Sequence, residues 1–181
     1  TTESYIGRSE FNRSSGVSTE TMYVGYKYGT SGTLENNRTN ENDSTIKTYV
    51  DTWYKNNLND YSRYLSKDAV YCNDREVAEG QTYSTTSNFW YASNYRIIAP
   101  TYNCTNIHDA FSANNASAKL DYPIALMTAD EVFFAGGSDT ESTTWYYYNS
   151  NNESATGTTN WRLLTPVQAH QVFIIFDEYL S

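Results

Sequence analysis

The strongest periodic pattern in the chain is helical and covers residues 46–65. Apolar residues recur there at helical spacing, and polar residues occupy the opposite face. The apolar positions are Ile46, Val50, Trp53, Tyr54, Leu58, Tyr61 and Leu65, and the polar ones are Lys47, Asp51, Lys55 and Asn59. Asp43 or Ser44 can cap the first turn. The pattern predicts an amphipathic helix that covers a sheet, with Trp53 as a core anchor.

A second helix is predicted by its ends rather than by its periodicity. Thr128 is followed three residues later by Glu131, which is the spacing of a capping box. Gly136 and Gly137 can end the helix at its C-terminus. We therefore expect a short helix over residues 129–135, entered from a strand over residues 120–127.

Short apolar or aromatic runs separated by turn residues predict several strands. We expect strands over residues 22–29, over 96–100 with an end at Pro100, over 145–148, over 161–164 with an end at Thr165 and Pro166, and over 172–176. Residues 33–43 and 149–159 read as polar loops. Residues 1–20 lack periodicity and are expected to be a polar leader or linker, and residues 21–181 a single α+β domain.

The composition is dominated by uncharged polar residues. Asn, Ser and Thr total 61 of 181 residues, and there are 18 Tyr. Tyrosine supplies rigid amphipathic contact area at low entropic cost, so this mixture suits a recognition surface. The alternative is a surface-biased composition without specific meaning.

The charge of the chain excludes some classes of partner. The net charge is −9, and the few cations are scattered rather than gathered in a stripe. Nucleic acids and anionic membranes repel such a surface. We therefore expect no nucleic-acid partner and no insertion of this segment into a membrane.

The two cysteines, Cys72 and Cys104, have no further cysteine or histidine at metal-binding spacing. They are either one disulfide or two buried thiols. The composition favours an exported protein, so we predict the disulfide. It would close a loop of roughly 30 residues, which stabilises by about 3–4 kcal/mol.

A further set of motifs consists of residues 23–29, 43–47, 51–58, 72–75 and 122–132, together with Gly136, Gly137, Trp161, Thr165 and Pro166. These motifs resemble those of a domain found in surface proteins of gut Gram-positive bacteria. Such domains look like distant members of the C-type-lectin fold, a group that includes formylglycine-generating enzymes and the variable proteins of diversity-generating retroelements. The resemblance implies two helices packed on small twisted antiparallel sheets with long loops.

The resemblance also implies that the ligand-binding surface lies within residues 145–181. An aromatic and polar cluster there supplies the candidate contacts: Trp145, Tyr146, Tyr148, Trp161, Arg162, Gln168, His170, Gln171, Asp177 and Tyr179. Core packing or a solvated loop is the alternative for each, and Trp161 is the one most suited to a core. Family members usually add a closing strand with a Gly-Val-Arg-Pro motif. Its absence before Ser181 predicts a cut chain, a diverged end or a strand supplied by another chain.

The sequence offers no convincing catalytic set. His108 and His170 belong to no nucleophilic motif, and Cys72 and Cys104 do not match the copper site of formylglycine-generating relatives. Glu131, beside Asp130, is expected to serve in helix capping. Asp139 and Glu141 could contribute oxygen ligands to calcium, but the usual sugar-binding calcium motifs are absent. We therefore expect no cofactor and no catalytic activity.

These observations predict a secreted or cell-surface module, either an adhesin or a receptor-binding domain, and within the resemblance a variable protein. Its partner would be an extracellular protein or glycan. The alternatives are a pilin-like or surface-layer subunit and, less favoured, an enzyme of the formylglycine-generating type.

Overall fold

A computed structural model describes residues 9–12, 20–135, 161–169 and 171–175. Its elements, in chain order, are η1 (Thr21–Val24), β1 (Lys27–Tyr28), α1 (Leu34–Asn37), β2 (Asn42–Asp43), α2 (Thr45–Asn57), η2 (Asn59–Tyr64), β3 (Tyr71–Cys72), η3 (Ala92–Ile98), β4 (Ala110–Phe111), η4 (Ala116–Ala118), α3 (Ala129–Phe134), β5 (Trp161–Gln168) and β6 (Gln171–Ile175), where η denotes a 3-10 helix. This mixture of helices and small antiparallel sheets confirms the α+β class. None of the described helices combines the length and apolar character needed to span a membrane.

Helix α2 forms where the apolar periodicity predicts it, but it is shorter than expected. Ser44 caps it by accepting a hydrogen bond from the Lys47 backbone N–H. The α-helix ends at Asn57, and the chain continues as the 3-10 helix η2. Val50 and Tyr54 are buried as predicted, whereas Trp53 is only half-buried. The prediction that Lys47 lies on the solvent face is wrong, because its side chain is fully buried.

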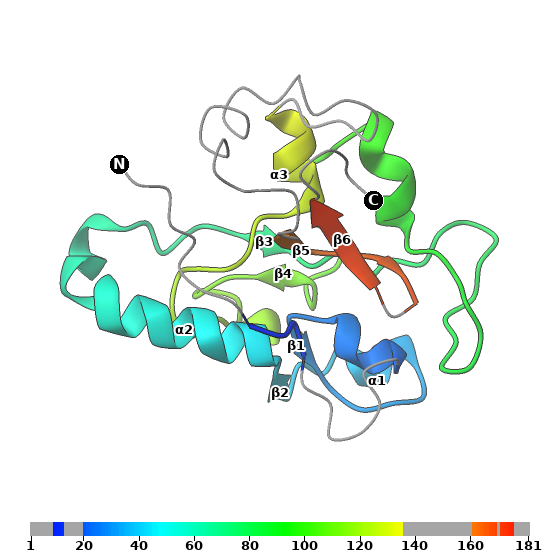
Figure 1. Cartoon of the computed structure of the whole chain (residues 1–181), viewed down its shortest axis with the longest axis horizontal. Helices are drawn as coiled ribbons and strands as arrows, with labels where there is room; N and C mark the ends of the chain where they lie inside the picture. The colour runs from blue at the N-terminus through cyan, green and yellow to red at the C-terminus, as the bar shows by residue number, and fades with distance from the viewer. Residues whose placement is uncertain (1–8, 13–19, 136–160, 170, 176–181) are drawn as a thin grey trace.

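Two sheets of two short strands form the central and lower parts of Figure 1. Strand β1 pairs with β2, and β3 pairs with β4, both antiparallel. The predicted strand over residues 22–29 is therefore wrong for its first half, which is the 3-10 helix η1. The expected loop over residues 33–43 instead contains α1 and β2. Tertiary pairing decides such short strands, because propensity alone is weak over a few residues.

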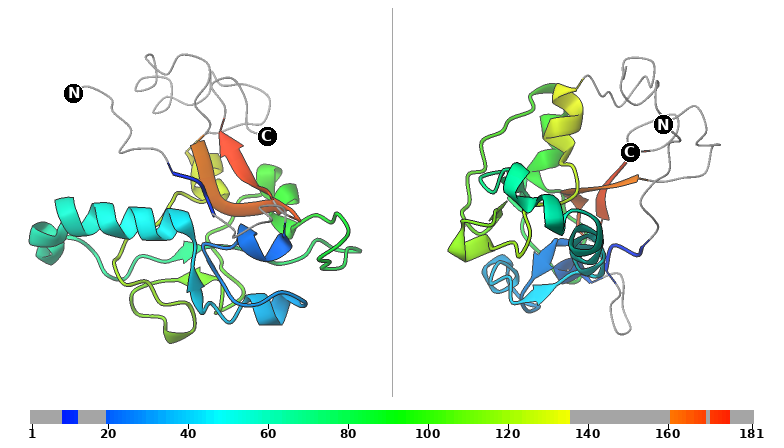
Figure 2. Two further views of the ribbon diagram at one scale, coloured as in Figure 1. Left: turned by 60° about the horizontal axis from the view of Figure 1, so that its bottom comes forward. Right: turned by 90° about the vertical axis from the view of Figure 1, so that its left-hand side faces the viewer.

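Strands β5 and β6 form an antiparallel hairpin beside α3 and η3 (Figures 1 and 2). The predicted end of β5 at Thr165 and Pro166 is wrong, since β5 continues to Gln168. The register shifts on both sides of Pro166. A proline is tolerated at such an irregularity because it lacks the N–H that a regular ladder needs. The last apolar run forms β6 as predicted.

Helix α3 has the predicted capping box. Thr128 accepts from the Glu131 backbone N–H, and the Glu131 carboxylate accepts from the Thr128 backbone N–H. The residues before it form no strand, although the Met127 carbonyl accepts a hydrogen bond from Leu164 N–H of β5. The predicted strand over residues 96–100 is also wrong, because residues 92–98 form η3. Ser93 at its start donates to the Pro166 carbonyl and so joins η3 to β5.

The described part of the hydrophobic core includes two clusters of buried side chains, which come from different elements. One contains Val24, Phe89, Tyr91, Ala169 and Val172, and Phe11 packs against it. The other contains Tyr26, Phe111, Ala118, Leu120 and Leu164. Each cluster therefore includes part of the β5–β6 hairpin, and burial of these side chains fixes the hairpin to the rest of the domain.

Candidate functional site

The β5–β6 hairpin carries the described part of the predicted ligand surface. Leu163, Leu164 and Val167 of β5 are buried, and so is Val172 of β6. Gln168 pairs with Gln171 at the closed end, and Trp161 pairs with Ile175 at the open end. The hairpin therefore has a buried centre, and the predicted contact residues lie at its two ends.

The hairpin does not bring all of these residues into one patch. Gln168 and Gln171 are separated from Trp161 and Arg162 by most of the length of β5. At about 3.3 Å per residue, that length is roughly 20 Å. A single small ligand therefore cannot contact both ends of the hairpin.

The remaining predicted contacts lie outside the described residues. They are Trp145, Tyr146, Tyr148, His170, Asp177 and Tyr179. The calcium candidates Asp139 and Glu141 also lie outside, as does the loop over residues 149–159.

An aromatic residue outside the predicted contacts, Trp90, lies next to the closed end of the hairpin. Trp90 forms a β-bridge with Gln168 and is 36% exposed, whereas Phe89 and Tyr91 on either side are buried. The Ala169 N–H donates to the Phe89 carbonyl, and the Tyr91 N–H donates to the Val167 carbonyl. Trp90, Gln168 and Gln171 thus form one surface, which we call the hairpin tip. Residues 89–91 are all aromatic, so no sequence periodicity distinguishes Trp90, and only the burial of Phe89 and Tyr91 in the structure does.

A set of three carboxylates has the spacing of a metal site but already holds a cation. Oxygen atoms of Asp43, Asp51 and Asp121 lie within 4.8 Å of one another. The Nζ atom of Lys47 lies 3.0 Å from Asp43 Oδ2, 2.5 Å from Asp51 Oδ2 and 2.9 Å from Asp121 Oδ2. The ammonium group therefore takes the place that a divalent ion would need, and the cluster is a structural ion-pair network.

The pKa shifts in this cluster follow from burial and from the lysines. Burial alone would raise the pKa of Asp43, but hydrogen bonds from Lys27 and Lys47 outweigh it and hold the pKa below its usual value. Burial raises the pKa of Asp51 despite its bond to Lys47. Burial would lower the pKa of Lys47, and the surrounding carboxylates raise it instead, so this amine is protonated at neutral pH.

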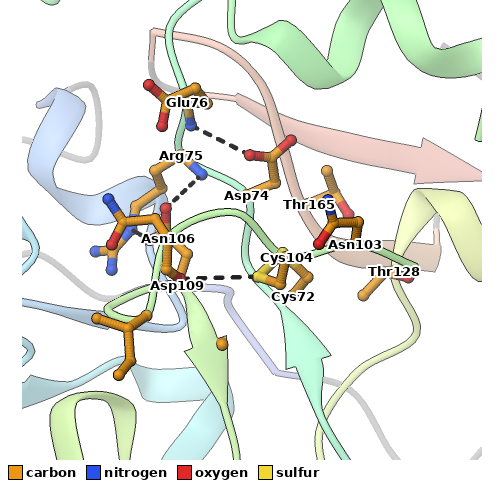
Figure 3. Close-up of a disulfide and its surroundings, with 12 residues drawn as sticks. Cys72, Asp74, Arg75, Glu76, Asn103, Cys104, Asn106, Asp109, Thr128 and Thr165 are labelled. Atoms are coloured by element: carbon orange, nitrogen blue, oxygen red, sulfur yellow. Dashed lines mark hydrogen bonds and ion pairs between the residues drawn. A yellow bond between two sulfur atoms is a disulfide. The ribbon is translucent and has the colours of Figure 1, made fainter. Parts of the chain in front are cut away.

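A second ion-pair network stabilises the loops around the disulfide (Figure 3). The Arg75 side chain is fully buried, and its Nε donates to Asp109 Oδ1 at 2.6 Å. Arg38 donates to the other oxygen of Asp109 and also pairs with Glu76. The remaining Arg75 donors reach Asn40 Oδ1 and backbone carbonyls. Buried charges are tolerated when they are paired and fully hydrogen-bonded, as they are here.

Cys72 and Cys104 form the predicted disulfide, with an S–S distance of 2.05 Å. Cys72 lies in β3, and Cys104 lies in the loop between η3 and β4. Together with the Arg75–Asp109 pair, the bond ties this long loop to the central sheet. The role of the disulfide and of this ion pair is therefore structural.

The candidate acid and base residues have structural roles. Glu131 serves in capping, as predicted, and the buried Asp130 accepts a hydrogen bond from the Thr101 backbone N–H at 2.7 Å. His108 is exposed, and its backbone carbonyl accepts from Asn40 and Arg75. His170 lies outside the described residues.

We compared the chain with known protein families, with curated proteins and with solved structures, and none of them matches it.

Proposed function

We propose that the protein is a non-catalytic extracellular binding module that acts as an adhesin or receptor-binding domain. The observation that carries the proposal is the hairpin tip. Gln168 and Gln171 pair there in β5 and β6, Trp90 forms an isolated β-bridge to Gln168, and the adjacent residues Phe89, Tyr91, Val167 and Val172 are buried. An aromatic side chain beside two amides offers apolar contact and hydrogen bonding on a pre-organised support.

Two further features support an extracellular role. The Cys72–Cys104 disulfide is a type of bond that persists in oxidising compartments. The net charge of −9 suits a soluble surface and disfavours polyanionic partners. The proposed partner is therefore an extracellular protein or glycan.

We further propose a C-type-lectin-like arrangement for this α+β domain. Its support is the combination of the capped helices α2 and α3 with small antiparallel sheets and long disulfide-tied loops. An experimental structure of the whole chain tests this proposal. It is abandoned if residues 136–160 do not complete a sheet together with the β5–β6 hairpin.

The binding proposal is tested with a triple variant of the hairpin tip, Trp90→Ala with Gln168→Ala and Gln171→Ala. The probes are immobilised mucin, collagen and fibronectin and a printed array of mammalian-type glycans. We expect the wild-type protein to bind at least one probe and the variant to bind it about tenfold or more weakly. Because the Trp90 side chain is only 36% exposed, its removal should also lower the melting temperature, so binding is measured well below the melting temperature of the variant.

The matched control is Tyr61→Ala with Tyr64→Ala, which removes two aromatic side chains that are 59% and 70% exposed in η2. The control should bind like the wild type. Equal binding by the hairpin-tip variant, or loss of binding only together with loss of the fold, contradicts the proposal. So does a wild-type protein that binds no probe.

A further inference from the structure

An aromatic pair outside the hairpin tip is also exposed. The rings of Tyr102 and Phe134 are stacked, with centroids 4.3 Å apart and planes inclined by 18°. Tyr102 is 69% exposed and Phe134 is 49% exposed. Burial therefore accounts for only part of the stabilisation of these rings, and much of each ring stays available for contact.

The chain around Tyr102 is fixed on both sides. The backbone N–H of Thr101 donates to the buried Asp130 carboxylate of α3 at 2.7 Å. Two residues after Tyr102, Cys104 forms the disulfide to β3. Between them, the Asn103 N–H donates to Thr101 Oγ1. The exposed ring of Tyr102 thus lies between two fixed positions of the backbone, the Thr101–Asp130 hydrogen bond and the disulfide. Figure 3 shows Asn103 beside the disulfide.

The helix that carries Phe134 is anchored in the same way. The Thr128–Glu131 capping box fixes its first turn, and the Ala129 N–H donates to Oγ1 of the buried Thr165 in β5. Val132 and Phe133 are buried, so the next residue, Phe134, faces outward at the end of the helix. Helix α3 and the chain that follows η3 therefore hold the two rings against each other before any ligand arrives.

Among the described residues, those next to Tyr102 and Phe134 in the chain are mostly polar and uncharged. Thr101, Asn103 and Thr105 flank Tyr102 in the chain, and Ala135 follows Phe134. Of the two carboxylates of α3, Asp130 is buried against Thr101, and Glu131 is engaged in capping. Charge complementarity thus favours an uncharged ligand. A pyranose ring fits this chemistry, because its C–H face stacks on an aromatic face and its hydroxyls pair with amides that both donate and accept.

We propose that Tyr102 and Phe134 form an aromatic platform that binds the pyranose ring of a neutral oligosaccharide. The platform uses residues of the η3–β4 loop and of α3, and it is separate from the residues of the hairpin tip. It is therefore a second binding site, and its existence does not depend on the hairpin tip.

The test is saturation-transfer NMR of the full chain with cellotriose, chitotriose, lactose and mannotriose at millimolar concentration. We expect at least one of them to bind, with the largest transfer to the C–H protons of one ring face. Tyr102→Ala and Phe134→Ala should each weaken that binding about tenfold. Tyr102→Phe keeps the ring and should retain the affinity within about threefold. Tyr64→Ala, which removes a ring that is 70% exposed elsewhere, should bind like the wild type.

Each variant is accepted only with the wild-type melting profile, and Tyr102→Phe provides the folded reference. The proposal is overturned if no sugar binds, or if Tyr102→Ala binds as well as the wild type. It is also overturned if a lysine decapeptide, rather than a sugar, competes for the two rings. Sugar binding that is lost only in the hairpin-tip variant would overturn the platform and leave the hairpin tip standing.

Discussion

Lys47 shows how a single residue can contradict a correct pattern. Its position in the helical repeat predicts solvent exposure, yet its side chain is fully buried among three carboxylates. Asp51 lies four residues after it in α2, at a spacing where helical side chains meet, and Asp43 lies four residues before it in β2, just ahead of the Ser44 cap. The third, Asp121, is 74 residues away, and only the folding of the chain brings it there.

Replacing Lys47 with methionine should be strongly destabilising at pH 7. Methionine keeps most of the buried volume but leaves neighbouring carboxylates without their cation, so we expect a loss of about 3 kcal/mol in the free energy of unfolding. Repulsion then raises the folded-state pKa of these carboxyls above their unfolded values. The destabilisation by these charged carboxylates is therefore full at a pH above their folded-state pKa values. It disappears as they become protonated, when the pH falls to about 4.

Urea denaturation at pH 7 and at pH 4 measures both effects of this substitution. Lys55→Met is the matched control, since Lys55 lies exposed on the same helix. A loss no larger than that of Lys55→Met, or one that does not shrink at pH 4, would show that the ion-pair network does not stabilise the fold.

Among the elements, the two helices with a predicted N-terminal cap begin where the sequence placed them. Ser44 and Thr128 both cap their helices, because a capping hydrogen bond joins residues only three positions apart. The short strands were less predictable. Residues 22–24 and 96–98 have strand-like composition but form 3-10 helices, and β5 passes through Pro166.

Substituting Thr128 with alanine should cost about 1 kcal/mol in the free energy of unfolding, because it removes the side-chain cap of α3. Thr52→Ala is the control, since Thr52 is an exposed residue within α2 whose hydroxyl donates to the Thr48 carbonyl of the preceding turn. Thermal unfolding followed by circular dichroism gives the comparison. Equal effects of the two substitutions would mean that the capping box contributes nothing beyond helix propensity.

Across the whole molecule, polar interactions hold together segments that contain little regular structure. The disulfide, the Arg75–Asp109 pair and the Lys47 cluster each join parts of the chain more than 30 residues apart. The two described core clusters both include residues of the β5–β6 hairpin. This framework keeps the hairpin tip and the aromatic platform in fixed positions at the surface.

The double variant Cys72→Ser with Cys104→Ser should lower the free energy of unfolding by about 3–4 kcal/mol, because the unfolded chain regains the freedom of a loop of roughly 30 residues. Reduction of the wild-type protein should produce a similar loss, measured by chemical denaturation with and without reductant. The single variant Cys104→Ser also opens the loop but keeps the Cys72 side chain as a free thiol. The difference in stability between the single and the double variant therefore measures the packing contribution of Cys72. A double variant as stable as the wild type would contradict a structural role of the bond.

The sequence alone determined the features that depend on near neighbours in the chain: the α+β class, the start of helix α2, the capping box of α3, and the final apolar strand. It also indicated the disulfide, through two cysteines in an export-like composition. Tertiary structure alone decided the burial of Lys47 and Arg75, the bridge between Trp90 and Gln168, and the stacking of Tyr102 on Phe134. The physical reason is distance along the chain. Capping and periodicity act over a few residues, whereas a buried charge or an aromatic pair depends on partners that only the completed fold brings together.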